Sequence, residues 1–168
     1  TSGPSEPVVP EIPPFLAEPT YAVVDTAEGL EHWIEAAVRA GSVAIWAAPS
    51  ALAGRRPEFC GIALAVGPGL ATYVPLGHRA SRAGEEPELL EPAVRDRGAA
   101  LSPDTALTRL KPLLEDPGVL KIGHDMKGMA HLLLRHGIAV APYDCTMLMS
   151  YVLDGGQDEH TVEALTKR

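Results

Sequence analysis

One stretch of this sequence places a histidine and an aspartate, both suited to metal binding or proton transfer, side by side at the start of a predicted helix. His124 and Asp125 follow a short apolar run and Gly123, and they open a segment whose apolar residues recur at helical spacing. An Asp at this position can accept hydrogen bonds from the free N–H groups of the first turn, or it can bind a hard cation. The N-cap is the commoner role, so we expect Asp125 to cap the helix. A displaced metal ligand is the alternative.

The remaining potential ligands do not form a recognisable metal motif. His131 and His136 are five residues apart and therefore lie on different sides of a helix, so we do not expect a zinc pair. Within residues 42–75 the only acidic residue is Glu58, on a predicted loop. The carboxylates that hard cations require are therefore sparse in this segment.

The stretch Leu120–Ile138 positions these residues. Val119–Ile122 is typical of a buried strand, Gly123 of a turn, and the following helix is expected to end at Gly137. This order of strand, turn and helix is half of an α/β unit.

The N-terminal half is expected to begin with a strand and a helix. Tyr21–Val24 forms the strand, and Asp25 caps the helix with Glu28 at the capping-box position. Gly41 ends this helix.

Three consecutive strands are predicted next, at Ser42–Trp46, Phe59–Val66 and Ala71–Pro75. Residues 67–69, Gly-Pro-Gly, are a hairpin signal between the second and the third. Strands joined in this way form an antiparallel meander.

The C-terminal half alternates helices and strands. A helix begins at Ser102-Pro103, and Pro112 is expected to kink or shorten it. Ile138–Val140 is expected to be a strand, Asp144 the cap of a helix that runs to Leu153, and Thr161–Leu165 a last short helix. The element order predicts an α/β fold, with a mixed sheet flanked by helices.

Composition restricts the function further. A chain of 168 residues is long enough for one domain with a proper core, and a net charge of −8 provides no strong field for phosphates. No apolar run reaches the roughly 18 residues of a membrane span, and the N-terminus lacks the pattern of a signal peptide. Cys60 and Cys145 have neither metal spacing nor a disulfide framework, so we expect a reduced, cytoplasmic setting.

Two regions are expected to lie outside the core. Residues 1–19 are Pro-rich and predict a tail or linker, which leaves residues 20–168 as the domain. Gly77–Ala100 is polar and rich in Pro and Gly, as is typical of a long loop. Arg55-Arg56 is too small a patch to indicate nucleic-acid binding.

Several segments of the chain, in one continuous order, resemble the 3′–5′ proofreading exonuclease domain of bacterial DNA polymerase I, a family A DNA polymerase. The run Gly123–Met129 resembles the second exonuclease motif of that family, roughly Gly-Gln-Asn-Leu-Lys-Tyr-Asp. The other similar segments are Tyr21–Ile34, Cys60–Ala65, Ala71–His78, Lys111–Ile122 and Tyr143–Leu153. The resemblance implies a ribonuclease H-like fold.

The resemblance also implies a two-metal site, in which Mg²⁺ or similar ions about 4 Å apart activate water and stabilise the leaving oxygen. The family supplies an Asp-X-Glu pair on the first sheet strand and an Asp in the second motif. Here Trp46 and Ala48 occupy the pair and Met129 occupies the third position. None of these can bind a hard cation, and we expect them to fill the former metal pocket with apolar side chains. The Tyr and Asp of the third motif would lie past Arg168.

The resemblance therefore implies a non-catalytic exonuclease-like domain, C-terminally truncated here, that supports a polymerase domain of the same polypeptide. It implies no metal cofactor, since Mg²⁺ is expected only in active relatives. An active metal-dependent 3′–5′ exonuclease with displaced carboxylates is the alternative. A stand-alone binding domain is a third interpretation.

Two positions keep a weak resemblance to nucleic-acid-binding residues. Lys127 occupies a family position and could face a phosphate, but it could equally be a solvated helix lysine. Leu52 matches an apolar residue beside the terminal base, although packing is the commoner role of a leucine. We expect DNA to bind weakly, or only in the full-length protein, and we expect no membrane contact.

Overall fold

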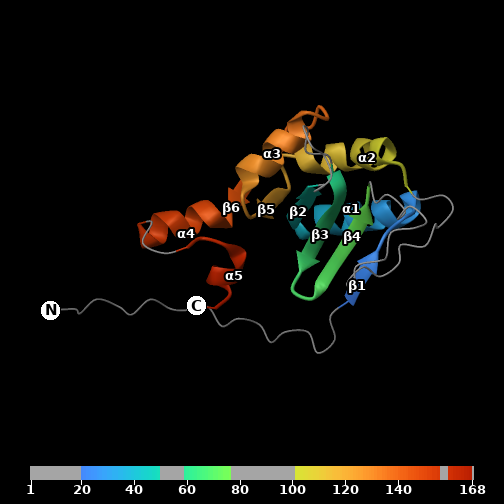
Figure 1. Cartoon of the computed structure of the whole chain (residues 1–168). Coiled ribbons are helices and arrows are strands. Elements are labelled where there is room, and N and C mark those ends of the chain that lie inside the picture. The colour runs from blue at the N-terminus through green and yellow to red at the C-terminus, as the bar shows by residue number, and fades with distance from the viewer. Residues whose placement is uncertain (1–19, 50–58, 77–100, 156–158, 168) are drawn as a thin grey trace, which may run out of the picture.

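A computed structural model of the chain describes residues 20–49, 59–76, 101–155 and 159–167 (Figure 1). Its centre is a six-stranded mixed sheet with the strand order β1-β4-β3-β2-β5-β6. None of the helices in these ranges is long and apolar enough to cross a membrane. The predicted tail at residues 1–19 and the predicted loop at Gly77–Ala100 lie outside the described residues.

The first strand and helix form as predicted, except at the cap. β1 (Thr20–Val23) runs parallel to β4, and α1 (Ala27–Ala40) ends at Gly41, whose φ of 69° favours glycine. The N-cap is Thr26 and not Asp25, because the Thr26 hydroxyl accepts the hydrogen bond from the Gly29 N–H at 3.1 Å. Both residue types cap helices well, so the sequence left a one-residue ambiguity.

The predicted antiparallel meander is confirmed. It consists of β2 (Ser42–Pro49), β3 (Phe59–Gly67) and β4 (Leu70–Pro75). The tight connection between β3 and β4 places Gly69 at a φ of 73°. β2 is longer than predicted and lies at the middle of the sheet, since its other edge pairs in parallel with β5.

The next unit contains α2 (Pro103–Glu115), β5 (Leu120–Gly123) and α3 (Met126–Leu134). Ser102 caps α2, and the helix continues past Pro112 to Glu115, so the proline does not shorten it. α3 ends at Leu134, earlier than the Gly137 signal suggested.

The expected strand at Ile138–Val140 is wrong, because these residues are neither strand nor helix. The side chains of Ile138 and Val140 are nevertheless buried. The segment is held by Glu115, whose carboxylate accepts from the Ala139 N–H at 2.9 Å, and by Lys111, whose ammonium donates to the Gly137 carbonyl. These contacts fix the segment without a sheet partner.

The C-terminal elements are β6 (Tyr143–Cys145), α4 (Thr146–Asp154) and α5 (Val162–Leu165). The expected cap at Asp144 is wrong. Asp144 lies in β6 opposite Ile122, and Cys145 occupies the N-cap position without a capping side-chain bond. A strand of three residues is too short to give a period-2 signal, so the sequence suggested only the helix.

One face of the sheet carries the core. Buried side chains of α1, α2 and α3 join those of β2, β3 and β4 in a single cluster that includes Leu30, Leu110, Leu133, Val43 and Leu64. In Figure 1, α1 lies behind β2, β3 and β4, and no labelled helix lies in front of them. Residues at alternate positions of these strands therefore point either into this core or toward the opposite face, which no helix of the described residues covers and which we call the open face.

α4 differs from the other long helices in its packing. Only Ser150 of its nine residues is buried, whereas its exposed large apolar side chains are Leu148, Met149, Tyr151, Val152 and Leu153. α4 extends beyond β6, away from the sheet (Figure 1).

Candidate functional site

Trp46 stands on the open face of the central strand. It pairs with Ala63 of β3, and its neighbours in β2, Ile45 and Ala47, point into the core. The Trp46 side chain is 55% exposed. The expectation that this residue fills a closed pocket is therefore wrong.

Ala48 lies on the same face, two residues further along β2. It pairs with Gly61 and is buried. The Tyr73 ring lies over Gly61 so closely that a Cβ at this glycine would collide with the phenol. Tyr73 therefore covers the strand beside Ala48, and glycine is needed beneath it.

The Tyr73 phenol is a weak acid in this setting. Burial, together with the neighbouring Cys60 thiol, raises the pKa of Tyr73 to about 12. The Cys60 thiol also donates a hydrogen bond to the Ala48 carbonyl at 3.4 Å. The phenol therefore stays neutral at physiological pH and can act as a hydrogen-bonding group but not as a base.

Met129 points into the core rather than toward Trp46. A Cβ at Gly123 would lie 2.9 Å from the Met129 Cε and 3.1 Å from the Ile45 carbonyl oxygen, so the methionine packs beside the end of β5. Its side chain is buried in the core cluster. Trp46 and Ala48 thus share one face of β2, whereas Met129 belongs to α3 and points into the core on the other side of the sheet.

Asp125 caps α3, as expected. Its backbone has a φ of 52°, and its carboxylate accepts from the Gly128 N–H at 3.4 Å. Next to it, His124 Nδ1 lies 3.0 Å from the Thr146 hydroxyl, which donates to the Gly123 carbonyl at 3.3 Å. Asp125 thus closes the first turn of α3, and His124 connects the start of α3 with the start of α4.

The metal ions of active relatives do not fit the residues present. Trp46, Ala48 and Met129 offer no oxygen ligand. Among the residues the structure describes, no group of three His, Cys, Asp or Glu side chains could hold a metal ion.

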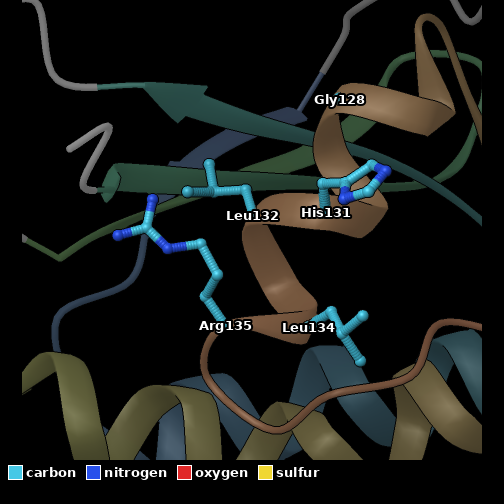
Figure 2. A pocket seen from close by; sticks show the side chains of 5 residues that line it. All are labelled: Gly128, His131, Leu132, Leu134 and Arg135. Atoms are coloured by element: carbon cyan, nitrogen blue, oxygen red, sulfur yellow. The ribbon is translucent and has the colours of Figure 1, made fainter.

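The weaker sequence candidates do not extend this site. Lys127 is exposed on α3, and Leu52 and Arg55-Arg56 lie outside the described residues. A shallow cavity of about 270 Å³ lies along α3, lined by Gly128, His131, Leu132, Leu134 and Arg135. Figure 2 shows Leu132 and Arg135 on one side of α3 and Leu134 on the other, an arrangement without convergent polar groups.

Two features of the structure escaped the sequence analysis. One is the Tyr73–Gly61 contact, which joins residues of adjacent strands that no local pattern links. The other is Lys121, fully buried in β5, whose ammonium donates to the Asp116 and Ala141 carbonyls at 2.8 and 2.6 Å. Burial lowers the pKa of Lys121, although Asp116 acts in the opposite direction. The sequence signal that could have indicated this buried lysine is its position within the apolar run Val119–Ile122.

The sheet order, with an antiparallel meander continued by two parallel strands, defines a ribonuclease H-like fold. Escherichia coli RNase D, an exoribonuclease, has the same fold with a TM-score of 0.54 and 17% identity, over 78% of this chain and 28% of that one.

Sequence comparison identifies the family. A family model described as 3′-5′ exonuclease of DNA polymerase A matches residues 21–168. DNA polymerase I of Rhizobium leguminosarum is 34% identical over 157 residues, which cover 88% of this chain and 15% of the relative. DNA polymerase I of Pseudomonas aeruginosa is 32% identical over 156 residues, which cover 90% of this chain and 15% of the relative. The chain belongs to the 3′–5′ exonuclease domain family of family A DNA polymerases, as the sequence resemblance indicated.

Proposed function

We propose that this domain is non-catalytic and serves as structural support for a polymerase domain of the same polypeptide. The chain spans about 15% of the length of the DNA polymerase I relatives that it matches, which favours a part of a larger polymerase. In this role the domain would bind DNA only weakly by itself, since its net charge is −8. We also propose a cytoplasmic location, in keeping with its two reduced cysteines.

The observation that carries the proposal is the exposed Trp46, which the sequence resemblance matches to the metal-binding Asp of the family. An indole on the open face of the central strand offers no oxygen to a hard cation. Ala48 and Met129 leave the other two positions without ligands as well. A two-metal hydrolysis needs several carboxylates around one point, and these three residues supply none.

The alternative, an active exonuclease with displaced carboxylates, would have to use Asp125 or Asp144. Asp125 is exposed and already caps α3. Asp144 of β6 pairs with Ile122 of β5, and Ile122 pairs with Ala44 of β2. Strand β5 therefore lies between Asp144 and β2. Adjacent strands are about 4.8 Å apart, so Asp144 lies roughly 10 Å from the central strand. This separation favours the non-catalytic interpretation.

A nuclease assay tests the proposal directly. Single-stranded DNA carrying a 5′ label is incubated with the unmodified chain in Mn²⁺ and, in parallel, in chelator. We expect no shortening of the labelled strand in either sample. Shortening that requires Mn²⁺ and disappears in Asp125→Ala or Asp144→Ala would establish the alternative instead.

Metal binding provides a second measurement. A site that binds Mn²⁺ would stabilise the fold by about 2.7 kcal/mol at a hundredfold excess of metal over its dissociation constant. We expect no saturable rise in melting temperature when Mn²⁺ is titrated. The polymerase link itself is tested by whether the reading frame continues past Arg168 into a polymerase domain. A frame that ends there would favour a stand-alone binding domain.

A further inference from the structure

We draw no further inference here: the strongest candidate, the exposed apolar face of α4 formed by Leu148, Met149, Tyr151, Val152 and Leu153, carries nothing, because nothing in the part of the chain that the structure describes shows what covers it.

Discussion

Trp46 of β2 and Met129 of α3 face opposite environments. Trp46 points to the open face, and Met129 is buried in the core beside Gly123. A carboxylate in place of the Trp46 side chain would be solvated. A carboxylate in place of the Met129 side chain would disrupt the packing of the core unless it turned outward. The two positions therefore differ in how they would tolerate charge.

This difference predicts the stability of two single variants. Trp46→Asp should change the free energy of unfolding by less than about 1 kcal/mol, because it replaces an exposed side chain. Met129→Asp should cost about 3–5 kcal/mol, because it leaves an unpaired charge where an apolar side chain was buried. Urea unfolding at pH 7 measures both, with Met129→Leu as the size-matched control for the second. Equal losses at the two positions would contradict the placement of Trp46 on an open face.

The buried lysine of β5 holds together the two chain segments that lead into β5 and into β6. Lys121 donates to the carbonyl of Asp116, before the strand, and to that of Ala141, before β6. If the ammonium were removed, both carbonyls would lose this donor, and the Asp116 carbonyl would keep only the Val119 N–H at 3.3 Å. The Lys121 side chain thus holds the segments that precede two adjacent parallel strands, β5 and β6.

Lys121→Met should therefore cost about 1–3 kcal/mol at pH 7, since it removes both hydrogen bonds of the buried ammonium. The pKa of Lys121 is lower in the folded state than its ordinary 10.5, so the unfolded chain binds more protons as pH approaches that value. By linkage, the parent gains stability over this range and Lys121→Met does not. The difference between them should widen as pH rises toward 10.5. Urea unfolding at neutral and alkaline pH measures it, and Lys127→Met, at an exposed helix position, should stay within about 0.5 kcal/mol of the parent.

The same elements explain what could be read from the sequence. The meander was predictable because β2, β3 and β4 are long and bounded by Gly and Pro signals, and α1 and α2 carry clear apolar stripes and glycine or serine ends. β6 was missed because three residues give no period, and Ile138–Val140 was misassigned because an apolar run can be buried without strand pairing. The family positions at Trp46, Ala48 and Met129 were identified by resemblance alone. Which way Trp46 points depends on the register of β2 with β3, which no local pattern contains.

At the scale of the whole molecule, apolar side chains divide into a packed set and an exposed set. The packed set lies between the sheet and α1, α2 and α3, and the exposed set is concentrated on α4, where Val152 and Leu153 are 78% and 84% exposed. α4 thus contributes little to the stability of the chain described here.

Two leucine variants test this division. Leu153→Ala should change the free energy of unfolding by less than about 0.5 kcal/mol, as for an ordinary surface substitution. Leu133→Ala, in the core at 1% exposure, should cost about 2–5 kcal/mol. Urea unfolding of the two variants beside the parent measures both values. A loss of several kcal/mol at Leu153 would mean that α4 is packed in solution.

The strand order also determines when the domain can assemble on the ribosome. β2, β3 and β4 pair with near neighbours in the chain, but the other edge of β2 pairs with β5, where Ser42 meets Leu120. At a synthesis rate of about 5–20 residues per second, β5 emerges roughly 4–16 seconds after the start of β2. During that interval the central strand presents an unpaired edge to other chains and to chaperones. The nascent meander is therefore the stage at which this domain is most exposed to wrong pairing, and the arrival of β5 ends it.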